Sequence, residues 1–221
     1  MNLNFNQLWR YQDDFLHGIQ TTLTLTLVAT VAGMLIGLAG ALLSNNRQPA
    51  VRLAVRTYVE IIRNTPALIQ IFLIFFVLPY AGLRLPPFEA AAVALSIYMG
   101  AYAVEIFRSG LASIPKSQIE AGLCLGLTQV QLFRYVILLP ALRNVYPSLA
   151  SQIILILLGS SLASQVSADE LFHTAAFVES RTYRSFEVYA VVCAIYFVMV
   201  LSLRLIFAGV ERIAFRWPTR R

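Results

Sequence analysis

Long apolar stretches separated by short charged segments dominate this sequence. We predict membrane-spanning helices over about 18–43, 65–83, 87–108, 144–167 and 187–208. A helix needs about 20 mostly apolar residues to cross the hydrocarbon core, because each residue rises about 1.5 Å. Five such spans leave little chain for anything else. The expected fold class is therefore an all-α integral membrane protein, with a single transmembrane domain over 1–221.

Composition supports the bilayer as solvent. The chain is 58% hydrophobic and 13% charged, with a mean hydropathy of +0.70, whereas an average soluble domain is about 25% charged. The net charge of +6 is spread between the apolar stretches and forms no basic stripe, so we expect no nucleic-acid binding. Cys124 and Cys193 have no CxxC or Cys/His spacing, so we expect neither a disulfide framework nor a metal site.

The distribution of basic residues predicts the orientation. Residues 1–17 lack the basic start and short apolar core of a cleaved signal, so the first span is expected to direct insertion. Lys and Arg resist translocation and stay on the cytoplasmic side. Thirteen of the 17 basic residues lie in the loops 44–64 and 108–143 or in the C-terminal tail, which includes Arg204, Arg212, Arg216, Arg220 and Arg221. We therefore expect the N-terminus outside and the C-terminus in the cytoplasm.

The cytoplasmic loop over about 113–135 has the pattern of two short helices. Pro115 prevents the third span from continuing. Gly126 stands between the two helices, where a positive φ could end the first. Two pairs have the spacing of a capping box, namely Ser117 with Glu120, and Thr128 with Gln131.

Apolar side chains in this loop offer a contact surface. They are Leu123, Leu125, Leu127, Val130 and Leu132. A helical pair of this kind is suited to insert into a groove of a soluble partner. The alternative is an interfacial helix whose leucines lie against the bilayer.

The loop also resembles a known family. Glu120-Ala121-Gly122, three further residues and Gly126 are similar to the EAA loop of ABC importer permeases. That resemblance implies a coupling loop against ATPase subunits, formed by Glu120, Ala121, Gly122, Gly126, Leu127 and Leu132. The segment 136–143 resembles the V-I-L-P-Q-A-L-R stretch of the polar amino acid branch, although Pro140 stands where glutamine is usual.

Other fragments of the branch follow in the right order. The segment 63–70 resembles R-G/N-T-P-x-L-x-Q, and 101–108 resembles A-Y-x-x-E-I-x-R. The segment 114–120 is similar to I-P-K-G-Q-x-E, with Ser117 in place of glycine. The segment 158–171 resembles K-x-T/S-S-L-x-S followed by E-L, with Leu158 where lysine is common.

The resemblance implies a transport subunit and not an enzyme. It implies the permease of an ATP-binding-cassette importer for polar or charged L-amino acids, in the inner membrane of a bacterium. Implied partners are two ATPase subunits that use ATP and Mg, a second permease chain, identical or similar, membrane lipid and an outer amino-acid-binding protein. This chain has no GxxxxGK[ST] motif and is expected to bind no cofactor itself. The outer segment 167–187 is the longest surface on which the binding protein could dock.

Small and polar residues in the fourth span are candidates for the substrate pathway. Transporter sites lie where helices are interrupted near the bilayer midplane. Ser160, Ser161 and Ser164 could open backbone groups to a ligand there, or could serve close helix packing. Glu105 in the third span is a functional candidate, since ionisable groups in a membrane are costly. Its alternative is an ion pair with Arg108, one turn away.

Further candidates lie at the start of the second span and in the third. Pro66 after Thr65 predicts a break between an interfacial helix over about 51–62 and the span, with Thr65 as the cap. The alternative is a simple helix start. A break would put Asn64 and Thr65 at the inner mouth of the pathway, which Gln70, Tyr98 and Tyr102 could reach from the second and third spans.

Two other classes of membrane protein compete with the importer. An intramembrane serine hydrolase would need a serine beside a histidine, but His17 and His173 lie in outer segments and no GxSxG occurs. A passive channel would explain the spans but not the patterned cytoplasmic loop. Dependence of transport on ATP hydrolysis by a partner separates the channel from the importer.

Overall fold

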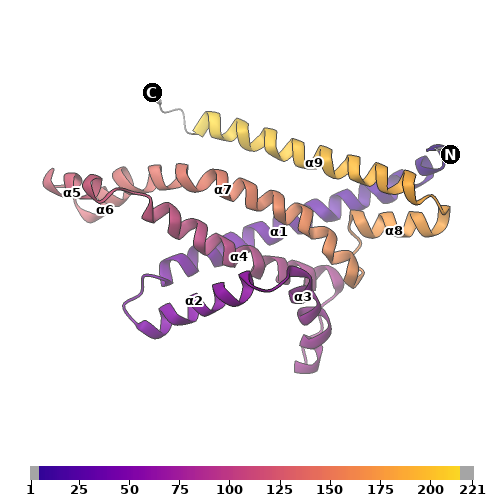
Figure 1. Ribbon diagram of the computed structural model, residues 1–221, viewed down its shortest axis with the longest axis horizontal. Helices are drawn as coiled ribbons and strands as arrows, with labels where there is room; N and C mark the ends of the chain where they lie inside the picture. Colours follow the sequence, from indigo (N-terminus) through magenta and orange to yellow (C-terminus); the bar gives the residue numbers. More distant parts are fainter. Residues whose placement is uncertain (1–4, 215–221) are drawn as a thin grey trace.

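The computed structural model of this chain describes residues 5–214, in which every regular element is helical (Figure 1). The long helices are α1 (Gln12–Leu43), α2 (Pro49–Arg63), α4 (Pro87–Ala112), α7 (Leu138–Gly159) and α9 (Ser185–Ala214). The short ones are α3 (Ala67–Phe72), α5 (Lys116–Cys124), α6 (Gln129–Gln131) and α8 (Leu171–Thr182). Tight 3-10 turns form η1 (Asn6–Tyr11), η3 (Leu78–Ala81) and η5 (Ser160–Val166), and wider π turns form η2 (Leu73–Val77) and η4 (Leu132–Ile137).

Four helical segments are long and apolar enough to cross a membrane. They are Asn6–Leu43, Pro87–Ala112, Gln129–Val166 and Ser185–Ala214. These are longer than the predicted spans 18–43, 87–108, 144–167 and 187–208. The reason is that charged residues end an apolar window without ending the helix, as Arg143 and Arg212 do inside α7 and α9. The all-α membrane fold is confirmed.

The second predicted span differs from the structure. Residues 67–81 pass through an α, a π and a 3-10 turn and become a fifth candidate span only together with α2, from which they are bent by 108°. Figure 1 shows α2 running beside the bundle and α3 turning away across its long axis. The break before Pro66 is therefore confirmed. The predicted span 65–83 corresponds to the helical segment Ala67–Ala81, whose backbone changes from α-helical to π and 3-10 hydrogen bonding after Phe72. Its crossing of the membrane stays a prediction.

The centre of the bundle is the contact between α1 and α4. Gly33 faces Met99 and Gly37 faces Ala103 so closely that a Cβ on either glycine would overlap its neighbour. Close approach of this kind is the usual means of holding helices together in lipid, where no hydrophobic effect drives them. Leu25, Ala29, Leu95 and Met99 are buried in the same core.

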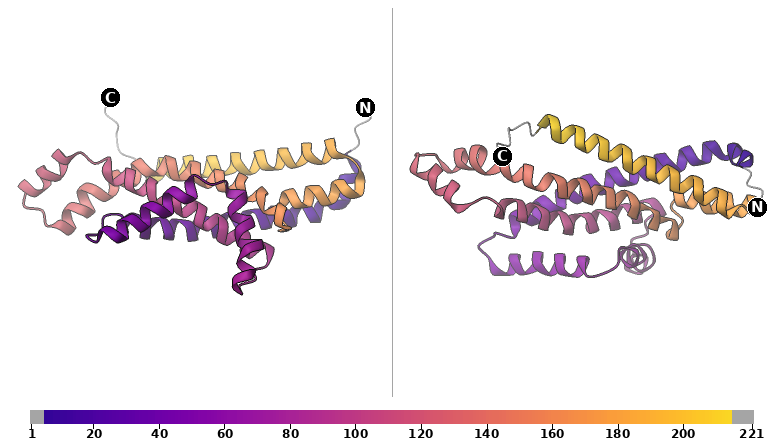
Figure 2. Two further views of the ribbon diagram at one scale, coloured as in Figure 1. Left: turned by 60° about the horizontal axis from the view of Figure 1, so that its bottom comes forward. Right: turned by 45° about the horizontal axis from the view of Figure 1, so that its top comes forward.

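The molecule has two distinct ends (Figures 1 and 2). At one, α5 and α6 project beyond the bundle on the side where α9 finishes; we call it the α5 end. At the other, α8 packs against the first turns of α1 and α9, and we call it the α8 end. Arg216, Arg220 and Arg221, which contribute to the predicted orientation, lie outside the described residues.

Candidate functional sites: the coupling loop and the substrate pathway

The predicted coupling loop is a helix, a glycine turn and the start of a long helix. Gly126 has φ +77 and follows α5, as expected. The Leu127 N–H donates to the Gly122 carbonyl at 3.2 Å and the Gly126 N–H to the Leu123 carbonyl at 2.9 Å. These bonds satisfy carbonyls that a helix end leaves free. The turn therefore fixes the orientation of α5 relative to the helix that follows it.

One of the two predicted capping boxes is present. The Thr128 hydroxyl accepts from the Gln131 N–H at 3.4 Å, and the Gln131 side chain accepts from the Thr128 N–H at 2.9 Å. The box at Ser117 is wrong, because α5 starts at Lys116 after Pro115 and has no side-chain cap. Pro115 fills that role through its extended backbone, and its carbonyl accepts from the Gln118 N–H at 3.0 Å.

Gly122 is the contact point between α5 and the start of the next helix. A Cβ at Gly122 would lie 2.6 Å from Cδ1 of Leu132, which is buried. Leu132 therefore points inward and holds the loop together, contrary to its predicted place on the apolar surface. The second predicted helix is also not separate, since α6 continues through η4 into α7. The loop is thus rigidly joined to a membrane-crossing segment.

The outer surface of the loop is apolar and open. Leu125 is 81% exposed and Val130 75% exposed. Glu120 and Ala121 are exposed beside them, and Leu127 is half-buried. Phe133 and Tyr135, which are not among the predicted surface residues, are exposed on the same segment. They extend the exposed apolar patch, and such patches are typical of interaction sites.

The α2–α3 bend is held by one buried amide. Gln70 is only 7% exposed, and its Nε2 donates to the Ile62 carbonyl at 2.9 Å and to the Thr65 hydroxyl at 2.9 Å. The Thr65 hydroxyl donates back to the Ile61 carbonyl at 2.9 Å, so Thr65 completes the end of α2 and does not cap α3 as predicted. Asn64 likewise donates to the Glu60 carbonyl at 2.8 Å. These polar groups stabilise an interruption of the helix.

Glu105 lies in an ion-pair cluster beside the bend. Its carboxylate is 3.0 Å from the Arg108 guanidinium and 4.0 Å from that of Arg63. The Arg63 guanidinium lies 5.2 Å from the ring centre of Tyr102, a distance suited to a cation–π contact. The rings of Tyr98 and Tyr102 are 4.8 Å apart. The pair with Arg108 is present as the sequence suggested, and Arg63 is an additional partner.

The three candidate serines lie at the end of the fourth span and not in its middle. The α-helix stops at Gly159, and Ser160, Ser161 and Ser164 are in η5. Each hydroxyl donates to a carbonyl three residues earlier, at 2.6 to 2.7 Å. The segment η5 packs against α3 and α4. The structure thus brings both the serine turn and the α2–α3 bend next to α3, where helices are interrupted.

A buried carboxylate at the α8 end was not among the predicted site residues. Glu170 is fully buried and caps α8, accepting from the Phe172 and His173 N–H groups at 2.8 Å each. The Tyr196 hydroxyl of α9 donates to it at 2.9 Å, and the Thr22 hydroxyl of α1 accepts from the Leu171 N–H at 3.1 Å. Burial raises the pKa of the Glu170 carboxyl above its usual value, although the hydrogen bonds it accepts oppose the shift.

This cluster of Thr22, Glu170 and Tyr196 joins three helices. The one sequence signal for this cluster is the pair Glu170-Leu171, which belongs to the segment 158–171 that resembles the family pattern. The partners of Glu170 on α1 and α9 follow from the fold and not from a local pattern. The segment 167–187, predicted as an outer loop, is largely the helix α8.

Comparison with known proteins gives the family. The chain matches the family described as binding-protein-dependent transport system inner membrane component over residues 13–216. It belongs to that family. The resemblance of the coupling loop and of the other fragments to ABC importer permeases is therefore confirmed, and membership favours a permease of a driven transport system over a passive channel.

Relatives cover nearly the whole permease. It is 38% identical to the L-cystine transport system permease protein TcyB of Bacillus subtilis, over 88% of this chain and 84% of that protein. It is 32% identical to the glutamine transport system permease protein GlnP of Escherichia coli K12, over 96% and 98%. Among solved structures, an amino acid ABC transporter with histidines matches with a TM-score of 0.90 and 36% identity, over 96% of this chain and 99% of that one.

Proposed function

We propose that this permease carries polar or charged L-amino acids into a bacterial cell, driven by a separate ATPase. The relatives and the solved structure named above are described as L-cystine, glutamine and amino acid transporters. Their common chemistry is an amino acid, and several named substrates have polar side chains. The observation that carries the mechanism is the exposed apolar loop formed by α5, Gly126 and α6.

The α5 end is the proposed cytoplasmic side. Basic residues concentrate at that end, which agrees with the preference of Lys and Arg for the cytoplasmic face. An ATPase groove would there receive Leu125 and Val130, with Glu120 and Ala121 at its edge. ATP and Mg belong to that partner. The α8 end then faces outward, where an amino-acid-binding protein would deliver substrate to α8 and its neighbours.

Two permease chains and two ATPase subunits make the proposed complex. Gly122 packs on Leu132, and Leu132 begins the turn that continues into α7. Movement of α5 by the ATPases would therefore be passed directly to a membrane-crossing segment. Rocking of these helices would open a central site alternately to each side.

The proposed substrate pathway follows the interrupted helices. Interruptions free backbone groups, and such segments line the cavities of transporters. The bend contributes Asn64, Thr65 and Gln70, with Tyr98, Tyr102 and Glu105 of α4 next to it. The turn η5, which packs against α3, contributes Ser160, Ser161 and Ser164.

Co-expression with candidate ATPase subunits tests the docking surface. We compare the wild type with Leu125→Asp combined with Val130→Asp, which puts two charges into the apolar contact. The matched control is Ser180→Asp combined with Tyr183→Asp, two exposed positions at the opposite end. The ATPase should co-purify with the wild type and the control, and should be lost from the loop variant, because each buried unpaired charge costs several kcal/mol.

Equal ATPase recovery with the loop variant and the wild type would contradict the proposed docking surface. Failure of every co-expressed ATPase to associate with the wild type would remove the support for an ATP-driven importer.

A further inference from the structure

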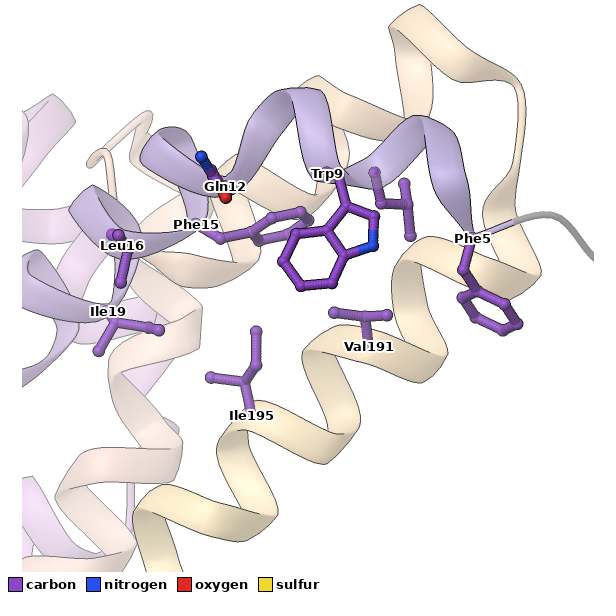
Figure 3. Close-up of a pocket in the computed structure, with 9 residues that line it drawn as sticks. Phe5, Trp9, Gln12, Phe15, Leu16, Ile19, Val191 and Ile195 are labelled. Carbon is purple, nitrogen blue, oxygen red and sulfur yellow. The ribbon is translucent and has the colours of Figure 1, made fainter.

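A basic cleft separates α2 from α4 near the α5 end. Its volume is about 440 Å³, and its lining includes Arg52, Arg56, Arg63 and Arg108 together with Glu60 and Glu105. Four guanidinium groups and two carboxylates leave it with a net charge of about +2. It is separate from the apolar groove between the start of α1 and α9, which Trp9, Phe15 and Ile195 line at the other end of the molecule (Figure 3).

Three of the four arginines of the cleft, Arg52, Arg56 and Arg63, share one face of α2. The α2 residues at 52, 55, 56, 59, 60 and 63 line the cleft, and this spacing is that of a single helical face. The other face carries Leu53 and Ile61, which are exposed. Because α2 runs beside the bundle of long helices, these exposed apolar side chains are available to lipid acyl chains.

Two of the arginines have no carboxylate partner among the described residues. Glu105 is shared by Arg63 and Arg108. The Arg52 guanidinium donates only to the Asn46 carbonyl, at 3.3 Å, and Arg56 is in no ion pair. Glu60 accepts from the Asn64 amide at 3.2 Å. The cleft therefore presents two available guanidinium groups, which favour phosphate oxygens.

The mouth of the cleft lies where the apolar stretches of α1 and α4 end. Ser44 and Asn45 line it directly after α1 ends at Leu43, and Arg108 lines it near the end of α4. The apolar stretches of both helices finish there, so this level is the border of the hydrocarbon core. Basic pockets between membrane helices on the cytoplasmic side are suited to anionic headgroups.

We propose that this cleft binds the phosphate headgroup of an anionic phospholipid, with Arg52 and Arg56 as its main ligands. Leu53 and Ile61 on the outward face of α2 would contact the acyl chains. Its assignment to the inner leaflet rests on the proposed orientation of the permease, whereas the headgroup binding does not. The choice of lipid over free phosphate rests on the apolar residues beside the arginines.

Native mass spectrometry of the purified chain tests this site. Short-chain phosphatidylglycerol and phosphatidylcholine are titrated against the wild type and against Arg52→Gln combined with Arg56→Gln. Each basic residue near an anionic lipid surface contributes about 1 kcal/mol, so the double variant should bind phosphatidylglycerol about 30-fold more weakly. Phosphatidylcholine binding should not change.

Two further variants separate charge from folding. Arg204→Gln combined with Arg212→Gln removes the same charge from exposed positions on α9 and should bind phosphatidylglycerol like the wild type. Arg52→Lys combined with Arg56→Lys keeps the charge and should stay within a few-fold of it. Equal loss in the α9 variant, or full loss in the lysine variant, would overturn the proposal. Displacement of the lipid by millimolar inorganic phosphate would also overturn it, in favour of a free anion.

Discussion

At the α5 end, large apolar side chains such as Leu125 and Val130 project from a short helix and a turn into open space. At the α8 end, the polar groups of Glu170, Tyr196 and Thr22 are buried and hydrogen-bonded between three helices. In the first arrangement apolar surface stays exposed. In the second the buried polar groups have hydrogen-bond partners. The difference agrees with the proposed docking of an ATPase at the α5 end, whereas the Glu170 cluster at the α8 end has its hydrogen-bond partners within this chain.

Removal of the buried carboxylate should give the largest effect on stability. Glu170→Ala leaves two N–H groups of α8 and the Tyr196 hydroxyl without an acceptor in a buried setting. A lost cap costs about 1 kcal/mol and each buried unpaired group about 1–3 kcal/mol, so we expect a loss of about 3 kcal/mol. Thermal unfolding in detergent measures it. A change below about 0.5 kcal/mol would contradict the account of the α8 end.

The same carboxylate should contribute to the pH dependence of stability. Burial raises the folded-state pKa of Glu170 above the unfolded value of about 4.3. A raised pKa means that the folded state binds the proton more tightly, so this contribution is fully present below the unfolded pKa. It is lost as pH rises through the folded pKa. Glu170→Gln cannot titrate, so its melting temperature should fall less than that of the wild type over this window.

Overpacking at Gly122 should have a smaller effect on stability and a clear effect on coupling. Gly122→Val puts methyl groups against Leu132, which is buried and has little room to move. Overpacking costs about 1–3 kcal/mol, and we expect about 2 kcal/mol together with reduced ATPase stimulation. Gly209→Val on α9 is the matched control, since a Cβ at Gly209 meets nothing within 4 Å. Full stimulation by Gly122→Val would contradict the proposed transmission from α5 to α7.

Substitution of the exposed loop residues should have the smallest effect on stability. Leu125→Asp combined with Val130→Asp changes side chains that touch little in the free chain, so we expect the free energy of unfolding to change by less than about 0.5 kcal/mol. Unfolding of the purified chain without ATPase measures this. A large loss would mean that these side chains support the fold of the permease itself, and the contrast between the two ends would disappear.

Four of the five predicted spans coincide with long apolar helices, because apolar length is visible in the sequence. It also predicts the positive φ of Gly126 and the capping box at Thr128, since both depend on residues a few positions apart. It fails at Ser117, where Pro115 starts the helix two residues earlier than the box requires. A local pattern such as a capping box predicts the helix start correctly where no neighbouring residue, such as Pro115, favours a different start.

Features that depend on distant groups are not predictable in the same way. The 108° bend between α2 and α3 is held by the Gln70 amide, which reaches back to Ile62 across the break. In the Glu170 cluster, Glu170 and Tyr196 are 26 positions apart in the sequence, and Thr22 and Leu171 are 149 positions apart. Leu132 has the same apolar character as Leu125, and only packing against Gly122 turns it inward. These three sets of contacts depend on the folded chain, and no local pattern in the sequence indicates them.

Uptake by proteoliposomes tests the central claim most directly. The permease is reconstituted with its ATPase, and labelled amino acid is supplied outside with an amino-acid-binding protein. We expect accumulation against the gradient only when ATP is enclosed, and loss of accumulation in the Leu125→Asp, Val130→Asp variant. Entry that only equalises the two sides, at the same rate with and without ATP, would contradict an ATP-driven importer and identify a passive channel.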